Sequence, residues 1–427
     1  MRAIIGMLVL LSASLYAELR CGIPETISRG LQANVSPAVD VNERGEAIAK
    51  WISYNGQQHT VAVALCVGES GWSEPDIIPD SCLGKLGVTL ARIDDQGTGY
   101  VMWHSRFFPK SLLYFSKKDP GDVWSNPVSI LTEEDRLKQP FFAFNSKFQP
   151  FILTQYEKDH WEESWAIRYQ PGEKMTRRLA RLNSIKSLVF NKQGSGFATW
   201  TFCQERSAEK FSTCFENVLQ AVWTQEGERF YPYVTICQLA LDYKHAKYFA
   251  AVNNQEGGAL TWCSWKESDY RIFATSGTKK KWAEPLLIAQ LSTLPVELQI
   301  AIDDQDNMVA AWIEESQLRV AYKDCSESWG VPMTLSNPNK LCQAFKLGTN
   351  EAGRFILAWD EECKCGEIVV HGADFALEKW NKTQLSATGQ KCWAPVFAFN
   401  SKGEGVIAWM TFLEGDSHIQ VANWSVK

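Results

Sequence analysis

The sequence lacks the marks of several protein classes. Its 427 residues carry a net charge of −6, without the basic excess that most nucleic-acid-binding proteins show. After residue 17, no stretch approaches the roughly 20 apolar residues that a membrane-spanning helix needs. No amphipathic helical pattern of useful length can be found. These absences argue against a nucleic-acid partner and a membrane span, and they favour a chain built from strands.

The sequence also lacks the short motifs of common catalytic sites. It has no HExxH, no Gly-x-Ser-x-Gly and no glycine-rich loop that would cradle a phosphate. The six histidines are scattered. Cys363-Lys-Cys365 would suit metal or redox chemistry, but it lacks the second ligand pair of a zinc site. We therefore predict no catalytic residue, no metal and no cofactor, and we favour a function without catalysis.

What the sequence does contain is a repeat. A turn residue, Asn or Asp, recurs at spacings of 46 to 62 residues, and in all but the third copy a Trp follows nine positions later. The turn residues are Asn42, Asp94, Asn145, Asn191, Asn253, Asp303, Asn350 and Asn400. Their partners are Trp51, Trp103, Thr154, Trp200, Trp262, Trp312, Trp359 and Trp409. A period near fifty with this texture predicts a β-propeller whose blades have four antiparallel strands.

The second copy shows the strands of one blade, which we call a, b, c and d from the inside outward. Val88–Ile93 alternates as strand a, and the turn that starts at Asp94 leads to strand b. Leu112–Ser116 is strand c, and the segment from Trp124 to Ile130 is strand d. Pro127 suits an outer strand, because one edge of that strand has no partner.

The two ends of the chain predict closure of the ring. The eighth copy stops after its strand c, whereas the segment Cys21–Ser28 resembles the strand d of another copy, Trp329–Ser336. We therefore expect the N-terminal strand to complete the last blade and to remove an open sheet edge. The prediction is a single eight-bladed domain over 18–427, with a seven-bladed ring plus an extra hairpin as the alternative.

The first residues predict export. Arg2 is followed by an apolar run to Leu11 and by a cleavage site after Ala17, which is typical of a secretory signal peptide over 1–17. The alternative is a buried N-terminal strand. We expect a secreted, periplasmic or cell-envelope protein, and the residues before Cys21 do not match a lipoprotein signal.

An exported chain with twelve cysteines is expected to form disulfides. Three pairs are candidates on spacing: Cys66 with Cys82, Cys203 with Cys214, and Cys342 with Cys392, which occupy matching positions of neighbouring repeats.

The aromatic residues are mostly part of the repeat. Twelve of the 18 tryptophans fall at the strand-b or strand-d position, where packing between blades is the simplest interpretation. Trp161 and Trp265 lie on or beside loops between strands b and c, where they could stack on a ligand.

One motif links the repeats to a known family. Asp119-Pro-Gly121-Asp-Val-Trp124 has the Asp-x-Gly-x-x-Trp core of the Asp-box, although Lys117 replaces the usual Ser. The chain thus resembles sialidase-like and related extracellular propellers at the level of the repeat, and in that family the motif serves folding. The resemblance implies a glycoside-acting enzyme as an alternative function. The arginine cluster and the Arg-Ile-Pro motif that a sialidase needs are not recognisable here. The comparison with eight-bladed quinoprotein dehydrogenases implies no cofactor, since their docking motif has a shorter Gly-to-Trp spacing.

The loops between strands b and c share one face of a propeller, and loops often carry function. Acidic residues are frequent in these loops from the third to the eighth repeat, beside an aromatic and basic patch in the second; the alternative is an ordinary solvated surface. The fourth repeat is the longest, and its loop Phe202–Glu216 is the best single prediction for a partner site, or else a tolerated insertion. The candidate binding residues are Arg106, Phe107, Phe108, Trp161, Glu205, Phe211, Trp265, Glu314, Glu315, Glu361 and Glu362.

The leading hypothesis is a secreted propeller that presents loops to a protein or a glycan, with a monomeric state as an expectation. A structural scaffold of the cell envelope is a further alternative. The sequence does not distinguish it from the leading hypothesis.

Overall fold

The computed structural model describes residues 19–426 with internal gaps, and every named element in it is a strand. The gaps are 33, 55, 69–70, 82–84, 108–109, 131–136, 159–160, 171–172, 179–183, 207–213, 240–243, 268, 326–327, 351–353 and 377–378. Side chains at some strand ends, such as 202–206 and 214–217, are outside the description as well. The predicted signal peptide, 1–17, also lies outside it. No helix in the described part has the length and apolar character that crossing a bilayer requires.

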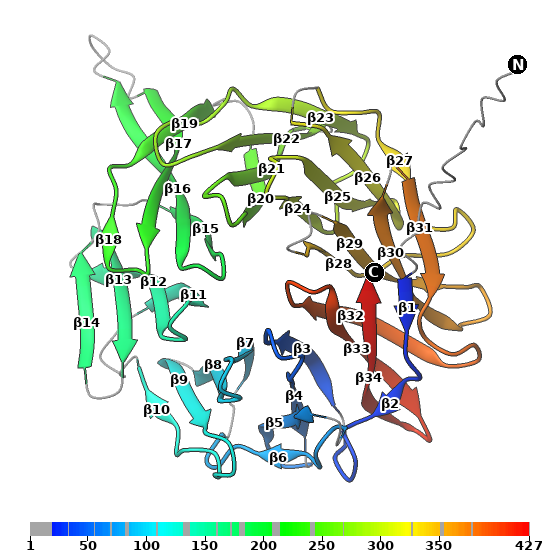
Figure 1. The fold of residues 1–427 in the computed structure, drawn as a ribbon. Helices are drawn as coiled ribbons and strands as arrows, with labels where there is room; N and C mark the ends of the chain where they lie inside the picture. The colour runs from blue at the N-terminus through cyan, green and yellow to red at the C-terminus, as the bar shows by residue number, and fades with distance from the viewer. Residues whose placement is uncertain are drawn as a thin grey trace, which may run out of the picture.

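The repeats of the first half fold as successive antiparallel sheets (Figure 1). The first sheet contains β3 (Val35–Val41), β4 (Ala47–Tyr54), β5 (His59–Cys66) and β6 (Asp76–Ile77). The second contains β7 (Lys85–Ile93), β8 (Gly99–Phe107), β9 (Lys110–Lys118) and β10 (Val128–Ser129). The third contains β11 (Leu137–Phe144), β12 (Pro150–Lys158), β13 (Trp161–Gln170) and β14 (Glu173–Arg178). The fourth contains β15 (Ser184–Phe190), β16 (Ser195–Arg206), β17 (Cys214–Gln225), β18 (Arg229–Phe230) and β19 (Val234–Leu239).

The second half continues the pattern and ends in a larger sheet. One sheet contains β20 (Lys244–Val252), β21 (Gly258–Lys266), β22 (Asp269–Gly277) and β23 (Leu286–Leu291). The next contains β24 (Leu298–Ile302), β25 (Met308–Glu314), β26 (Gln317–Lys323) and β27 (Met333–Thr334). The nine-stranded sheet contains β28 (Phe345–Thr349), β29 (Phe355–Glu362), β30 (Ile368–Ala376), β31 (Lys379–Gln384), β32 (Lys391–Phe399), β33 (Glu404–Leu413), β34 (Asp416–Val426), β1 (Leu19–Cys21) and β2 (Glu25–Thr26).

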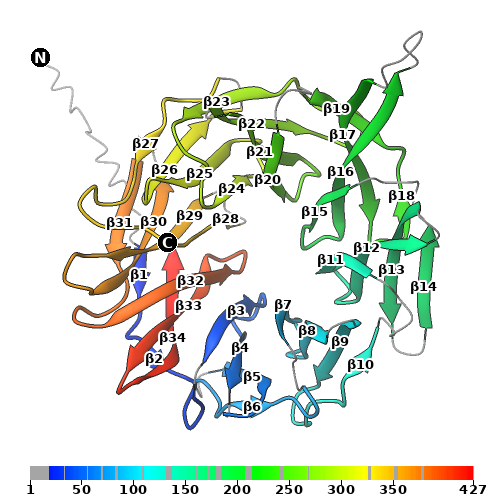
Figure 2. The same cartoon turned by 180° about the vertical axis from the view of Figure 1, so that it is seen from behind.

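The nine-stranded sheet consists of two antiparallel groups joined by one parallel contact, between Ile368 and Lys391. Its outer edge is made by the N-terminal residues, as the sequence predicts. In β1, Cys21 lies opposite Trp424, and in β2, Thr26 lies opposite Gln420. Figures 1 and 2 show the sheets side by side around a common centre, with the first strand of each repeat innermost.

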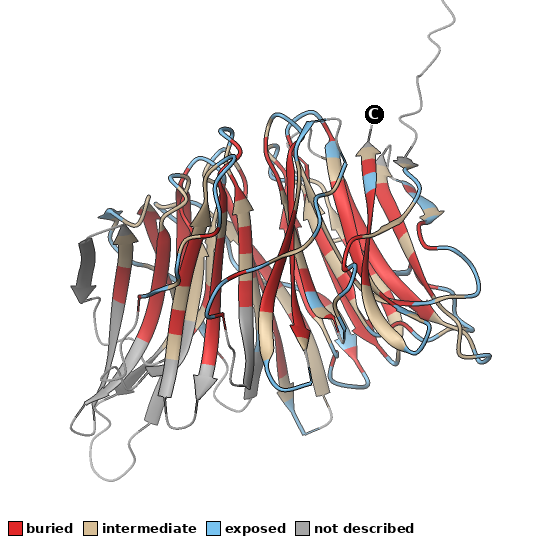
Figure 3. Ribbon diagram, turned by 90° about the horizontal axis from the view of Figure 1, so that it is seen from below, coloured by how far each residue is buried: buried red, intermediate tan, exposed pale blue. Residues whose placement is uncertain are grey.

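The predicted turn and tryptophan have the expected roles. The side-chain oxygen of Asn191, for example, accepts hydrogen bonds from the backbone N–H groups of Gln193 (3.0 Å) and Ser195 (2.9 Å). The strand-b tryptophans are buried in every repeat that has one, and Figure 3 shows that buried positions run through the middle of the strands. Burial of such large rings between neighbouring sheets is the main apolar contribution to the fold.

The turn amides also connect neighbouring repeats, which the sequence analysis did not predict. Asn42 Nδ2 donates to the carbonyl oxygen of Asp94 (2.7 Å), and Asn253 Nδ2 donates to that of Asp303 (2.7 Å). Asn400 Nδ2 donates to the carbonyl oxygen of Asn42 (3.3 Å), so the last repeat contacts the first. An Asp side chain could accept the hydrogen bonds of the turn equally well. Only the Asn amide can also donate a hydrogen bond to the next repeat.

The Asp-box-like turn is structural in this chain, as the resemblance implies. Asp119 accepts hydrogen bonds from Thr98 Oγ1 (3.2 Å) and Lys117 Nζ (2.9 Å). Gly121 has a φ of +82°, which glycine adopts without strain, and Trp124 is buried.

The predicted disulfides need correction. Cys66, Cys342 and Cys392 are free thiols, and Cys82 lies outside the described residues. Cys342 and Cys392 are buried in different clusters, since matching positions of neighbouring repeats are separated by the spacing between sheets. In the long hairpin, Cys203 lies opposite Asn217 and Cys214 opposite Arg206, so the two are not cross-strand partners, and their sulfur atoms are not described.

Candidate functional site

The predicted acidic side chains differ in their surroundings. Glu314 and Glu361 are buried, Glu362 is half-buried, and Glu315 is exposed. Glu362 accepts a hydrogen bond from Gln343 Nε2 (2.7 Å). Only part of the predicted acidic face therefore reaches solvent.

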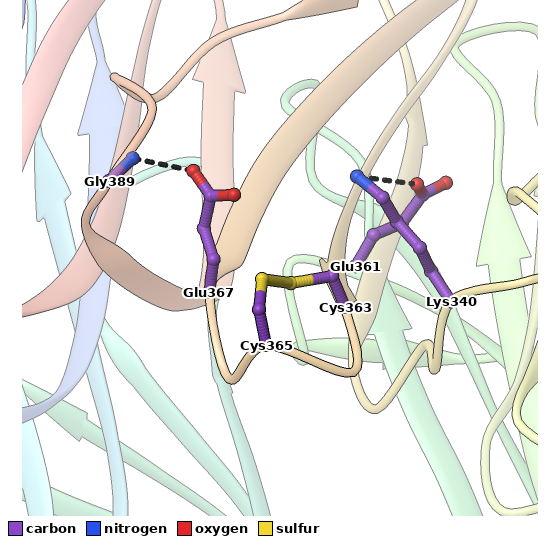
Figure 4. Close-up of a disulfide and its surroundings, with 6 residues drawn as sticks. All are labelled: Lys340, Glu361, Cys363, Cys365, Glu367 and Gly389. Carbon is purple, nitrogen blue, oxygen red and sulfur yellow. Dashed lines mark hydrogen bonds and ion pairs between the residues drawn. A yellow bond between two sulfur atoms is a disulfide. The ribbon is translucent and has the colours of Figure 1, made fainter.

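Glu361 is held in a network of internal partners. Its Oε1 accepts hydrogen bonds from Trp359 Nε1 (2.9 Å) and from the backbone N–H of Asn337 (2.9 Å). Its Oε2 lies 3.4 Å from His371 Nε2. The same oxygen lies 3.9 Å from Lys340 Nζ (Figure 4). Burial lowers the pKa of His371 although Glu361 opposes this shift, so we expect a neutral imidazole at neutral pH.

Glu314 has the same position in the preceding repeat. It accepts a hydrogen bond from the backbone N–H of Ser292 (3.3 Å) and lies 3.2 Å from Arg319 Nε. In both repeats the acid stands two positions after the repeat Trp. That position is buried and polar wherever the structure describes it, and its occupants are Ser53, Ser105, Ser264, Glu314, Glu361 and Thr411.

The next residue in the sixth repeat lies in a strained turn. Glu315 and Ser316 form the two-residue connection between β25 and β26, with φ values of +49° and +60°. Both values belong to a type I′ turn, which favours Asn-Gly. The Glu315 carboxylate accepts a hydrogen bond from Ser292 Oγ (2.8 Å).

The other predicted residues are only partly placed. Arg106 and Phe107 end β8, Trp161 begins β13 and Glu205 lies in β16, but their side chains are outside the described part. Phe108 and Phe211 lie outside it altogether. Trp265 lies in β21, opposite Lys244 of β20 and Tyr270 of β22, and is half-buried.

The insertion of the fourth repeat lengthens a hairpin. The ladder between β16 and β17 continues to the pair Arg206–Cys214, so most of the predicted loop 202–216 is strand. Figure 1 shows this hairpin extending beyond its neighbours. The outer strand β19 pairs with the middle of β17, from Asn217 to Ala221.

A groove lies between this outer strand and the next sheet. It has a volume of about 680 Å³, within the range of small-molecule sites. Its lining includes β19, the face of β21 and β22, and the segment before β23. The lining residues are Thr235, Ile236, Cys237, Gln238, Leu239, Trp262, Ser264, Arg271, Phe273, Glu284 and Pro285.

The groove combines an aromatic floor with a few polar groups. The rings of Trp262 and Phe273 are stacked, with centroids 5.8 Å apart. Arg271 Nη2 lies 2.7 Å from Asp269 Oδ2. Burial and, to a smaller degree, the Glu284 charge raise the pKa of Cys237 to about 12, so its thiol is neutral at physiological pH.

The sequence analysis missed this groove. Its members come from two repeats, and of these residues only Trp262 was considered, as a packing residue. One signal was available: residues 271, 273 and 275 alternate along strand c, so that one face of this strand meets the neighbouring repeat. Which of these side chains border open space depends on the neighbouring outer strand.

The centre of the molecule is also lined by polar groups on the side of the a–b turns. A cavity of about 170 Å³ is bordered there by turn residues such as Asn191, Asn253 and Asp303. Lys192 Nζ lies 3.0 Å from Glu43 Oε1 and links the fourth repeat to the first. The described lining of this cavity contains no arginine.

No family model matches the sequence, and no curated protein matches it. Among solved structures, the chain is similar to polysaccharide lyase Uly1, with a TM-score of 0.53 and 8% identity over 94% of this chain and 91% of that one. The propeller domain of the Trilobed protease from Pyrococcus furiosus gives a TM-score of 0.46 and 11% identity over 84% and 99% of the two chains. The NanB sialidase from Streptococcus pneumoniae gives 0.36 and 10%, over 95% and 70%. The likeness to the lyase, at this identity, concerns the fold, and at that level the predicted sialidase-like propeller resemblance is confirmed.

Proposed function

We propose that this chain is an exported, eight-bladed propeller that binds a glycan in the groove between β19 and the sheet of β20–β23. Pairing of β1 and β2 with β34 and the bond from Asn400 to Asn42 support a ring closed by the N-terminal strand. Export rests on the signal-peptide pattern of 1–17.

The observation that carries the binding assignment is the composition of the groove. Phe273, half-buried against the buried Trp262, offers an apolar surface, and Arg271, Gln238 and Glu284 offer hydrogen-bonding groups around it. Sugar rings present one apolar face and a rim of hydroxyl groups, so a site of this mixed character suits them. Polysaccharide lyase Uly1, by its name, acts on a glycan and has a related fold.

We assign binding rather than cleavage to the groove. Retaining glycosidases place two carboxyl groups about 5 Å apart. Among the described lining residues, Glu284 supplies the one carboxylate, and the nearby Asp269 is paired with Arg271.

Among the four acidic candidates whose side chains are described, Glu315 and Glu362 reach solvent, and we retain these two as a second contact surface. Replacing both with Lys should weaken attraction to a basic partner at low salt, because such exposed contacts are screened by ions. Equal partner binding by the variant and the parent chain would exclude this surface.

A glycan array with the full chain tests the groove. Thr235→Trp fills it from the exposed side, and Glu284→Lys changes its charge. Glu74→Lys is the matched control, because Trp72-Ser-Glu74-Pro and Trp282-Ala-Glu284-Pro occupy the same repeat position and both glutamates are exposed. We expect the two groove variants to lose at least about tenfold in affinity for any glycan that the parent chain retains, roughly the loss of one good contact.

If both groove variants bound glycans as the parent chain does, the groove would not be the binding site. If the chain bound proteins and no glycan, the proposed ligand class would be wrong. Release of shortened glycan during the same incubations would replace the assignment of binding with catalysis.

A further inference from the structure

The turn between β29 and β30 carries a disulfide between two cysteines that one residue separates. Cys363 and Cys365 are bonded, with Cα atoms 5.3 Å apart (Figure 4). Cys365 is exposed and Cys363 is half-buried. The structure contains other thiols, and Cys325 is an exposed one that remains free. Oxidation is therefore found at this turn and not at every accessible cysteine.

The backbone holds this turn without help from the sulfur atoms. The N–H of Cys363 donates to the carbonyl oxygen of Glu367, and the N–H of Gly366 donates to the carbonyl oxygen of Cys363, both at 2.9 Å. Gly366 has a φ of +80°, which suits glycine. The two cysteines should thus stay close together when reduced, and a bond across so short a loop restricts the unfolded chain less than a long one would.

Charged side chains lie on both sides of the sulfur atoms: Lys364 favours a thiolate, whereas the Glu367 carboxylate disfavours one. Lys364, between the cysteines, is exposed, and a nearby positive charge stabilises a thiolate. Glu367 has a carboxylate oxygen within 4.8 Å of both sulfur atoms. The backbone N–H of Gly389, on the neighbouring connection, donates to this carboxylate and fixes its position (Figure 4).

One apolar side chain is exposed beside the turn. Leu341 is 51% exposed, and its backbone exchanges two hydrogen bonds with Glu362, the residue before Cys363. An apolar side chain that projects next to an accessible disulfide gives an incoming chain a contact close to the reacting atoms.

We propose that Cys363 and Cys365 form a thiol–disulfide exchange site whose substrate is an exposed dithiol on another polypeptide. A thiolate of the substrate attacks Sγ of Cys365, the more exposed sulfur, and forms a mixed disulfide. The bond between the two cysteines breaks, and Cys363 leaves as a thiolate that takes a proton. The second substrate thiolate then attacks the mixed disulfide and releases Cys365. The substrate is oxidised to its disulfide, and the turn is reduced to two thiols.

The first experiment follows the exchange with a synthetic peptide that contains two cysteines. The full oxidised chain and the reduced peptide are mixed, quenched with acid, alkylated and analysed by mass spectrometry. We expect the peptide to lose two hydrogens as the turn gains two, at a rate at least about tenfold above that of the Cys363→Ser, Cys365→Ser double variant. The Cys325→Ser variant is the matched control and should equal the parent chain.

The two single variants test the direction of attack. Cys363→Ser leaves the exposed Cys365 thiol, which should form a mixed disulfide with an activated peptide thiol faster than Cys363 does in Cys365→Ser. Equal peptide oxidation by the parent chain and the double variant would overturn the proposal. It would also be overturned if reduction required unfolding, seen as loss of the near-ultraviolet circular dichroism of the buried tryptophans before the bond opens.

Discussion

Replacing Asn253 with Asp tests whether the turn amides join neighbouring repeats. Asn253 is 4% exposed. Its Oδ1 accepts from the backbone N–H groups of Gln255 (3.0 Å) and Gly257 (2.6 Å), and an Asp would keep both bonds. Its Nδ2 donates to the carbonyl oxygen of Asp303 (2.7 Å) and to Oδ1 of Asp306 (3.0 Å), and an Asp would lose both.

The expected cost follows from these contacts. Loss of a donor to a buried carbonyl oxygen costs about 1–3 kcal/mol. The new carboxylate would also face two oxygen atoms, one of them charged, and an unpaired buried charge costs about 3–5 kcal/mol. Because the carboxyl can take up a proton instead, we expect a net loss of about 3 kcal/mol in unfolding free energy at pH 7.

The destabilisation caused by Asn253→Asp should depend on pH. Burial and Asp306 should raise the pKa of the introduced carboxyl above that of the unfolded chain. Its destabilising effect is then present above the folded pKa and fades as the pH falls through it. Urea unfolding at pH 7 and pH 4.5, followed by tryptophan fluorescence, measures both values.

Asp94→Asn is the control, since it makes the opposite exchange in a repeat that naturally has Asp. It retains an oxygen for the N–H groups of Gln96 and Thr98 (2.9 Å each) and should change stability by less than about 1 kcal/mol. The reasoning fails if Asn253→Asp is within about 0.5 kcal/mol of the parent chain, or if the control is destabilised as strongly.

Three further outcomes are expected. Asn400→Asp should lower the unfolding free energy by about 1–2 kcal/mol, because it removes the donor to Asn42, and an unchanged urea midpoint would count against ring closure. Lys50 is buried, which lowers its pKa to about 7, whereas the unfolded chain keeps the proton to about pH 10.5. Stability should therefore rise with pH across this window by up to about 1.4 kcal/mol per unit, and a flat profile, equal to that of Lys50→Met, would contradict it. Ser316→Gly should stabilise the chain by about 1 kcal/mol in thermal unfolding, whereas Gly415→Ser, in the equivalent turn of the last repeat, should destabilise it similarly.

The sequence predicts the strands well because their signals are local. The turn residue and the Trp nine positions later lie in one hairpin, so a single repeat contains the whole pattern. The boundaries of outer strands are less accurate. The segment from Trp124 to Ile130 was expected to be a strand, but only Val128–Ser129 has strand geometry. Ser125 and Ile130 add single backbone hydrogen bonds to β9, since an outer strand has one neighbour to define its length.

The sequence did not predict the groove because its two walls come from different repeats, so no single hairpin contains the pattern. Cys237 on β19 and Phe273 on β22 are 36 positions apart. Nothing local distinguishes Phe273 from any other apolar strand residue. The disulfide between Cys363 and Cys365, in contrast, lies within one turn, and the sequence analysis noted the pair without predicting the bond.

The buried acidic side chains have the same structural role in different repeats. The connection that enters each sheet is irregular, so its backbone N–H groups have no strand partner and need acceptors. Glu314 supplies one to Ser292, and Glu361 supplies one to Asn337. Ser53, at the equivalent position, instead donates to the carbonyl oxygen of Gln32 (3.0 Å).

Position therefore explains these side chains better than charge does. A polar residue two places after the repeat Trp binds the connection that leads into its own sheet, and Glu is one of several solutions. Counting acids along the b–c loops consequently overstates the negative charge that a partner would meet, because buried carboxylates with internal partners are largely hidden from solvent. Exposed residues such as Glu315 have to carry any electrostatic attraction on this face.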